Sequence, residues 1–293
     1  MGFVWPQRVS HFRIFQSLWR ALDFQLPNAI ARKIGGNMCN WVFKGLRTGI
    51  KTTSYPDGEE TAPGVSPGLP RGGEFTEYEA NLIASSCPNE ALRREGRKVI
   101  VDYRRCIHSF RCVRAIQTPI NWQSDYEWAT SVSEDNDPNR RLGRAFRHSA
   151  HILVVDAGDC GACLNEIKQL NNPYYNMHRL GFFITPTPRD ADILMVVGPV
   201  TVHMRLPLLK AYNAMPTPKR VIAVGACALS GGTFGPSFIS GAAVADVLPV
   251  DVEIPGNPPP PLAILHGLLV AVGRKPSAFL IPTEGTEKEV KIS

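Results

Sequence analysis

His151–Ile167, HILVVDAGDCGACLNEI, is the stretch that decides the fold. Four apolar residues, Ile152–Val155, form a short run that a turn rich in glycine and cysteine follows at once, and helical character begins at Leu164. This order predicts a buried parallel strand, a tight turn and a helix. In an open α/β sheet, ligands bind at such strand ends, because the amides of the following helix point into the crevice.

The turn carries a C-x-x-C pair, Cys160 and Cys163. Alone, this spacing fits a redox dithiol, half of a metal site or a chance pair. Two further strand-like segments lie downstream: Lys219–Leu229, which contains Cys227, and Leu248–Pro260, which ends in a rigid Pro-Gly-x-Pro-Pro turn. If these three strand ends converge, three thiols meet in one crevice, and thiolates are the donors that an iron–sulfur cluster takes.

A resemblance to a known family rests on four segments in order: the C-x-x-C-x-x-E start, ADILMVVGPVT (191–201), MPTPKRVIAVGACALSGG (215–232) and PVDVEIPGNPPPPLAIL (249–265). Together they resemble the small subunit of membrane-bound, energy-converting nickel–iron hydrogenases. They also resemble the homologous complex I subunit that carries the terminal cluster. The resemblance covers roughly residues 148 to 273 and implies an electron-transfer subunit of a complex of that kind.

The resemblance also implies the ligands of a 4Fe–4S cluster. Three of the family's four cysteines correspond to Cys160, Cys163 and Cys227, but the position of the fourth holds Asn257. A carboxamide is a neutral and weak ligand for iron. The expected cofactor is therefore one 3Fe–4S cluster, or one 4Fe–4S cluster whose last iron takes Asn257, water or a partner's side chain. An empty site is the alternative.

Glu166 is a further candidate. The resemblance suggests that it serves a proton path or a contact with the large subunit, whereas the first turn of a helix favours a carboxylate in any protein.

The N-terminal arm, residues 1–51, holds the excess of positive charge. It contains eight Lys or Arg residues and one acid, Asp23, while the whole chain has a net charge of +6. Phe12, Phe15, Trp19 and Leu22 recur at helical spacing, which predicts a basic amphipathic helix suited to an anionic membrane surface. Packing against a neighbouring subunit is the alternative.

The sequence also indicates where the chain works. It shows no nucleic-acid motif, no apolar run long enough to span a bilayer and no signal peptide. We therefore expect no nucleic-acid partner and a peripheral location at the cytoplasmic face of the inner membrane.

Residues 52–136 are interpreted as a linker, rich in proline and glycine up to about Gly73, and a degenerate ferredoxin-like domain. GLRTGIKTTSYP (45–56) and DYEWATSVSED (125–135) resemble segments of the two-cluster ferredoxin-like subunit of complex I and the same hydrogenases. Of eight expected cysteines, three remain: Cys87 in the first run, and Cys106 and Cys112 in the second. The other ligand positions hold Glu77, Ala80, Ile83, Ser109 and Ile116. One run keeps one thiol and the other keeps two, and neither set is enough to hold a four-iron cluster by itself. We therefore expect no cluster in this domain.

The predicted fold is therefore α/β, with a flavodoxin-like parallel sheet in residues 148–275. A small α+β ferredoxin-like domain and an amphipathic helical arm precede it, and a tail, 276–293, follows. No catalytic triad, Walker motif or dinucleotide fingerprint is present, so we expect no catalysis by this chain alone and disfavour a free nucleotide binder.

Two functions stay open. The first is electron transfer through one cluster, with a large-subunit homologue and membrane-embedded subunits as partners. The second is a redox-silent scaffold that couples those partners.

Overall fold

The computed structural model describes residues 38–62, 64–116, 120–132 and 142–278, and the amphipathic helix expected around Phe12–Leu22 lies outside them. The chain divides into two compact units, Met1–Lys51 and Thr52–Ser293. In the described part of the first unit, helix α3 (Met38–Thr48) exposes Trp41 and Phe43. No helix within the described ranges is long and apolar enough to cross a membrane.

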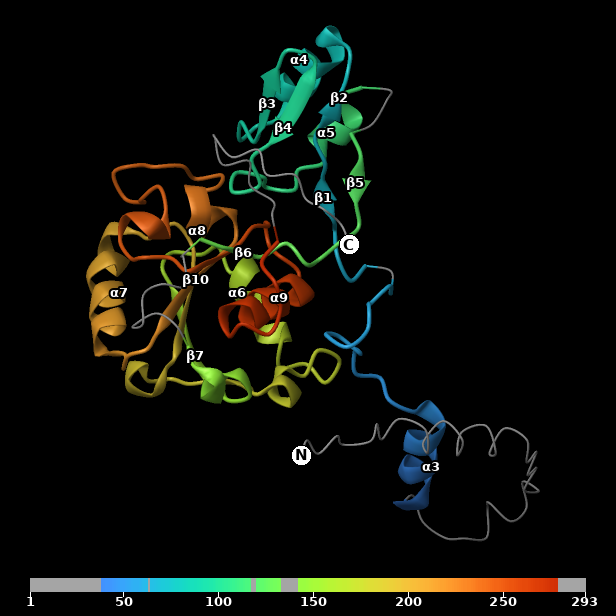
Figure 1. Ribbon diagram of the computed structural model, residues 1–293, viewed down its shortest axis with the longest axis vertical. Coiled ribbons are helices and arrows are strands. Elements are labelled where there is room, and N and C mark those ends of the chain that lie inside the picture. Colours follow the sequence, from blue (N-terminus) through green and yellow to red (C-terminus); the bar gives the residue numbers. More distant parts are fainter. Residues whose placement is uncertain (1–37, 63, 117–119, 133–141, 279–293) are drawn as a thin grey trace, which may run out of the picture. The chain divides into compact units, whose positions relative to one another are not determined.

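The second unit is built on a six-stranded sheet with the order β6-β11-β10-β9-β7-β8. Figure 1 labels β6, β7 and β10 of this sheet. All neighbouring strands are parallel except β6, which pairs antiparallel with β11. Their bounds are β6 (Thr130–Ser131), β7 (Ala150–Asp156), β8 (Phe182–Ile184), β9 (Ile193–Val197), β10 (Arg220–Val224) and β11 (Val252–Ile254). Numbered along the chain, the parallel strands follow the 2-1-3-4-5 order of doubly wound flavodoxin-like sheets. This confirms the predicted fold class, with its topological switch point between β7 and β9.

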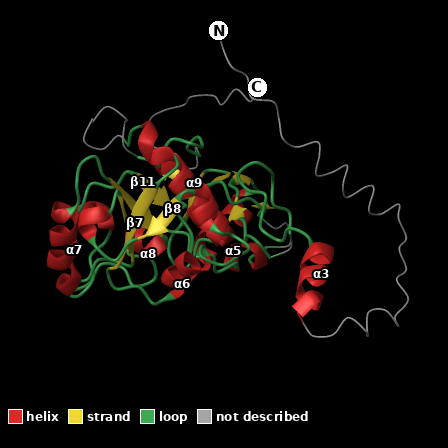
Figure 2. Cartoon of the chain, turned by 90° about the horizontal axis from the view of Figure 1, so that it is seen from below, coloured by secondary structure: helices red, strands yellow, loops and turns green. Residues whose placement is uncertain are grey.

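Helices cover both faces of this sheet. The side chains of Ile193 and Met195 pack in one core cluster with α6 (Ala162–Gln169) and α9 (Pro261–Ala271), and Leu194 packs in another with α7 (Val202–Ala214) and α8 (Ala226–Ser230). Figure 2 shows α7 and α9 on opposite sides of the strands. Because β9 and β10 are buried on both faces, they appear in the sequence as continuous apolar runs. Short 3-10 helices connect these elements: η1 (Arg144–Arg147), η2 (Met177–Leu180), η3 (Pro188–Asp190) and η4 (Val244–Asp246).

Residues 69–123 form a small α+β assembly. Its elements are β1 (Leu69–Pro70), β2 (Gly73–Glu74), α4 (Glu77–Ser86), β3 (Leu92–Glu95), β4 (Lys98–Val101), α5 (Arg111–Arg114) and β5 (Trp122–Gln123). Strands β2, β4 and β3 make an antiparallel sheet, and β1 pairs with β5. Helix α4 begins at a capping box between Thr76 and Glu79. Ala80 and Ile83, which occupy two of the lost ligand positions, are completely buried, so hydrocarbon fills that part of the domain.

The stretch that the sequence suggested as a linker, described at residues 52–62 and 64–73, packs within the second unit instead. It has little regular structure, yet Tyr55 and Leu69 are only 1% and 2% exposed. The amide of Thr53 donates to the carbonyl of Tyr174 at 2.8 Å. Tyr55 and Leu69 therefore belong to a hydrophobic core, where they pack with residues that are far away in the sequence.

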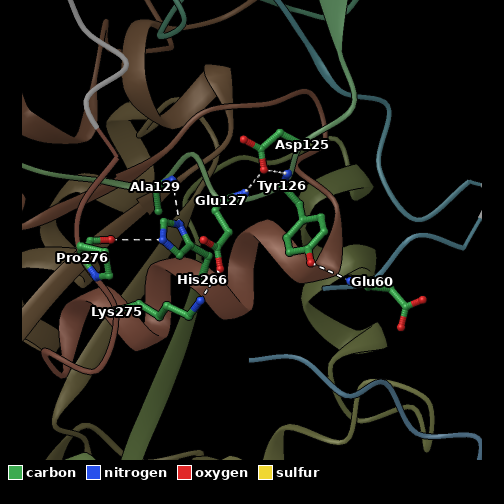
Figure 3. Close-up of polar contacts among 8 residues, drawn as sticks. All are labelled: Glu60, Asp125, Tyr126, Glu127, Ala129, His266, Lys275 and Pro276. Carbon is green, nitrogen blue, oxygen red and sulfur yellow. Dashed lines mark hydrogen bonds and ion pairs between the residues drawn. The ribbon is translucent and has the colours of Figure 1, made fainter. Parts of the chain in front are cut away.

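A buried histidine on α9 fastens the strand β6 region to this helix (Figure 3). Nδ1 of His266 accepts the amide of Ala129 at 3.1 Å, and Nε2 lies 3.2 Å from the carbonyl oxygen of Pro276. Both contacts are satisfied by the neutral ring with its proton on Nε2. Burial lowers the pKa of His266, although the charge of Glu127 opposes the shift.

We predict that acid weakens the fold through His266. The unfolded histidine takes a proton near pH 6.5, while the folded one resists it, so the free energy of unfolding falls as the pH drops below about 6.5. His266→Asn, which keeps an acceptor near the position of Nδ1 but does not titrate, should remove up to about 1.4 kcal/mol per pH unit of this slope. Urea unfolding between about pH 5 and 7.5 measures it. His203→Asn, at an exposed position on α7, is the control, and equal slopes in all three proteins would refute the assignment.

Candidate functional site

The carboxyl ends of four parallel strands, β7, β9, β10 and β11, are tied together by backbone hydrogen bonds. The amides of Gly225 and Ala226, just after β10, donate to the carbonyls of Ile254 and Gly256 at 2.8 Å each. At the next strands, the amide of Ala157 donates to Val197 at 2.8 Å, which links the ends of β7 and β9. The strand ends therefore converge on one edge of the sheet, as the sequence predicted.

Two carboxylates shape the turn that carries the C-x-x-C pair. Oδ1 of Asp156 accepts the amides two and three residues later, at 2.9 and 2.7 Å. Oδ2 of Asp159 accepts the amides of Gly161 and Leu164 at 3.0 and 3.1 Å, and so caps α6. Because Gly161 is the residue that precedes α6, the helix begins two residues before the predicted Leu164.

The backbone approaches two of the thiols too closely for any side chain. Cys163 and Cys227 are 2% and 3% exposed, whereas Cys160 is exposed. A Cβ on Gly225 would lie 2.5 Å from Sγ of Cys163, and one on Gly232 would lie 2.6 Å from Sγ of Cys227. These glycines leave space beside the sulfurs.

The three thiols also act on one another electrostatically. Burial raises the pKa of Cys163, and the charges of Asp159, Cys227 and Cys160 raise it further. Burial likewise raises the pKa of Cys227, with Cys160 among the smaller contributions. Burial therefore favours the protonated thiols of Cys163 and Cys227, and binding of iron to these two sulfurs must release protons.

Asn257 directs its side chain elsewhere. Its Nδ2 donates to the carbonyl of Ile107, in the small α+β assembly, at 3.4 Å. The preceding residue, Gly256, stays beside the thiols, because its carbonyl oxygen would lie 3.5 Å from a Cβ on Gly225. A role for Asn257 as a ligand remains a prediction.

Glu166 lies half-buried on α6, three residues after Cys163. Burial raises the pKa of its carboxyl group, and its charge contributes to the raised pKa of Tyr175. Burial thus favours the protonated form of this carboxyl group, but its role in a proton path or subunit contact remains a prediction.

The donor set suits a cluster better than a single metal ion. Within the described ranges, no three His, Cys, Asp or Glu side chains stand close enough to hold one ion. A single ion draws all its ligands to one centre, whereas a cluster spreads its thiolates over several irons. Iron bound by all three sulfurs would therefore have to belong to a cluster.

The sequence did not reveal the contacts that join the small α+β assembly to this edge. Arg104 pairs with Glu253 of β11 at 2.7 Å, and Oγ of Ser230 donates to the carbonyl of Arg104 at 3.0 Å. Burial raises the pKa of Glu253, and Arg104 opposes that shift. Partners separated by 149 and 126 residues leave no local pattern in a sequence.

Comparison with known proteins agrees with this geometry. Residues 160–271 match the family described as NADH ubiquinone oxidoreductase, 20 Kd subunit. Over 166 residues the chain is 39% identical to the probable membrane-bound hydrogenase subunit mbhJ of Pyrococcus furiosus, covering 55% of this chain and 99% of that protein. The chain belongs to this family.

Two further relatives are similar to shorter parts of the chain. Formate hydrogenlyase subunit 7 of Escherichia coli is 41% identical over 132 residues, 45% of this chain and 52% of that protein. An NADH-quinone oxidoreductase subunit of Carboxydothermus hydrogenoformans is 43% identical over 108 residues, 36% and 65% of the two chains. The chain thus spans about half the length of the Escherichia coli relative.

We predict that the free space beside Cys227 is essential for the fold of this edge. Gly232 and Gly235 both have positive φ, 55° and 62°, but only at Gly232 would a Cβ meet a neighbour within 4 Å. Gly235→Ala should therefore cost about 1 kcal/mol for the backbone alone, and Gly232→Ala about 1–3 kcal/mol more for the contact. Urea unfolding measures both, and equal losses would show that the close approach to Cys227 is unimportant.

Proposed function

We propose that the chain is the electron-transfer subunit of a membrane-associated complex related to complex I and energy-converting hydrogenases. The observation that carries the proposal is the gathering of Cys160, Cys163 and Cys227 at the sheet edge, inside the region that matches the family. A bound iron–sulfur cluster would accept and release single electrons there. The three thiolates would hold it, and Gly225 and Gly232 would let the backbone close around it.

The surroundings of these thiols suit a buried redox group. Cys163 and Cys227 lie in the core, so water has little access to their sulfurs. Burial and hydrogen bonds to sulfur set the potential of such groups. The backbone of Thr233 favours the Cys227 thiolate and partly offsets the rise that burial causes in its pKa. Asp159, fixed by its caps to α6, contributes negative charge that disfavours additional negative charge on the thiols.

The redox-silent scaffold is the second candidate, and one observation favours it. The position of the fourth ligand holds Asn257, whose amide already donates to Ile107. In this alternative, the fold keeps the shape of an electron-transfer subunit and connects a large-subunit homologue to membrane-embedded subunits without holding iron.

We place the large-subunit partner on an exposed apolar surface beside the sheet edge. It consists of Val202, Leu206, Phe234, Phe238 and Ile239. Phe238 is 90% exposed, and the amide of Val202 donates to Ile239 at 2.8 Å, which holds the start of α7 against the loop after α8. Because these elements follow β9 and the helix that carries Cys227, a partner seated there would lie next to the thiols.

We also propose roles for the two regions that precede the 20 Kd subunit domain, residues 1–51 and 52–136. The arm, residues 1–51, would attach the chain peripherally to an anionic membrane surface at the cytoplasmic face, since its described helix α3 exposes Trp41, Phe43 and Leu46 together with Lys44 and Arg47. Residues 52–136 would represent a degenerate ferredoxin-like subunit fused to the 20 Kd subunit domain.

Iron analysis tests the proposed electron-transfer role. The full chain, purified without oxygen and reconstituted with ferrous iron and sulfide, should bind about three or four irons at this site. Cys163→Ser should lose them, and Asn257→Cys should raise the iron content and alter the electron paramagnetic resonance spectrum. Cys39→Ser is the control. If Cys163→Ser binds as much iron as the original chain, the scaffold is the correct function.

The partner surface is tested by co-purification. Phe238→Asp places a charge in the centre of the apolar surface and should reduce recovery of the large-subunit homologue at least about tenfold, because burying an unpaired charge costs several kcal/mol. Iron content should not change. Tyr78→Asp, at a residue of α4 that is 74% exposed, provides a matched control. Full recovery with Phe238→Asp would exclude this surface.

A further inference from the structure

A polar cavity lies between the stretch that begins at Tyr55 and the segment that leads into β6. Its volume is about 430 Å³, within the range of cavities that hold small molecules. Cys160, Cys163 and Cys227 are not among the residues that line it. The side chains around it are mostly acidic, and the ionisable ones are Asp57, Glu59, Glu60, Asp125, Glu127 and Lys275.

The negative charge around this cavity is only partly balanced. Glu127 pairs with Lys275 at 2.8 Å, as Figure 3 shows, and the charge of Asp57 acts on Arg179. Among the residues that the structure describes, no ion pair reaches the other three carboxylates, those of Glu59, Glu60 and Asp125. Three negative charges therefore stand around the cavity without a cation.

A buried tyrosine hydroxyl group faces these charges. Tyr55 lines the cavity and is 1% exposed, and its hydroxyl group has no hydrogen-bond partner of normal geometry in the described part of the chain. Burial raises the pKa of Tyr55 most, and the charges of Glu127 and Asp125, which line the same cavity, raise it further. Buried hydroxyl groups normally have a partner. This one indicates a ligand that forms the missing hydrogen bond.

Lys275 shows how the chain holds an ammonium group at this place. Its Nζ pairs with the carboxylate of Glu127 and lies 5.4 Å from the centre of the Tyr55 ring. A carboxylate and an aromatic face both attract an ammonium group, and desolvation strengthens the second contact. Lys275 neutralises one carboxylate only, so the remaining charge favours further ammonium groups.

A metal ion suits this cavity less well than an organic cation. Within the described ranges, no three His, Cys, Asp or Glu side chains stand close enough to hold one ion. Oδ1 of Asp125 already accepts the amides of Tyr126 and Glu127, at 2.6 and 3.0 Å, and hydrogen bonding from Thr53 lowers the pKa of Glu60. The carboxylates are thus held in separate places, and a ligand with several cationic groups along a chain matches such spread charges.

We propose that this cavity binds a linear polyamine, an alkyl chain that carries two or more ammonium groups. One ammonium group donates to the hydroxyl oxygen of Tyr55, and the others pair with Asp125, Glu59 and Glu60. A free polyamine and neighbouring lysines of a partner protein both supply this chemistry. The site needs no iron and does not depend on the proposed electron-transfer role.

Titration calorimetry of the full chain with spermidine, in the absence of iron, tests the site. We expect saturable binding of one equivalent. Tyr55→Phe removes a hydroxyl group that has no partner, so the fold should tolerate it, while the affinity for spermidine should fall about tenfold. Asp125→Asn keeps the oxygen that accepts two amides but removes the charge, and should weaken binding about fivefold or more.

Two exposed residues that do not line the cavity provide matched controls. Tyr78→Phe on α4 and Glu95→Gln on β3 should bind spermidine as the original chain does. The site is refuted by a lack of saturable binding, by unchanged affinity in Tyr55→Phe, or by equal losses in Asp125→Asn and Glu95→Gln, which would indicate unspecific attraction to acidic surface. Circular dichroism verifies the fold of each variant.

Two further measurements identify the source of the ammonium groups and separate this site from the proposed function. A peptide Gly-Lys-Lys-Gly with blocked ends is titrated in the same way. Tighter binding of spermidine indicates a free polyamine, and tighter binding of the peptide indicates lysines of a partner protein. Cys163→Ser, which should lose iron, should bind spermidine like the original chain, so each proposal can fail without the other.

Discussion

The site at the sheet edge depends on two backbone hydrogen bonds, from the amides of Gly225 and Ala226 to the carbonyls of Ile254 and Gly256. They hold the end of β10 against the turn after β11 and so set where α8 begins. Cys227, the second residue of α8, takes its position from that start. These bonds involve no side chain, so the path of the backbone determines the arrangement. The cysteines can act together only because this path brings their positions to one edge of the sheet.

Much of this domain could be predicted from the sequence, because its information is local. Buried parallel strands are short apolar runs, and a turn rich in glycine after such a run marks the ligand-binding edge of the sheet. The convergence of the three strand ends follows from this rule alone. The start of α6 was placed two residues late, because Asp159 caps the helix from outside its first turn. The Asp159 carboxylate accepts two amides at the start of the helix, and the spacing of apolar residues in the sequence gives no sign of these hydrogen bonds.

The small α+β assembly was predicted less well, for a physical reason. Its contacts join residues far apart in the sequence, since Arg104 pairs with Glu253. Tyr55, which stands before this assembly at the start of a proline-rich stretch, is buried as well. Assigning thiols to sites by their order along the chain assumes that each run closes on itself. The structure places the end of α4, with Cys87, against the loop that precedes α5, so thiols from two runs meet.

Asn257 lies between the thiols at the sheet edge and those of the small α+β assembly, where its side chain makes a hydrogen bond that a cysteine could not make. A cysteine there would supply a fourth thiolate, but a thiolate has no proton to donate to the carbonyl of Ile107. The carboxamide has one, and its bond at 3.4 Å joins the turn beside Cys163 to the loop that carries Cys106. Together with the Arg104–Glu253 ion pair, this contact holds the two groups in one packed unit. Asn257 thus connects the turn beside Cys163 to the small α+β assembly, and the position of each thiol group depends on the fold of the other half of the unit.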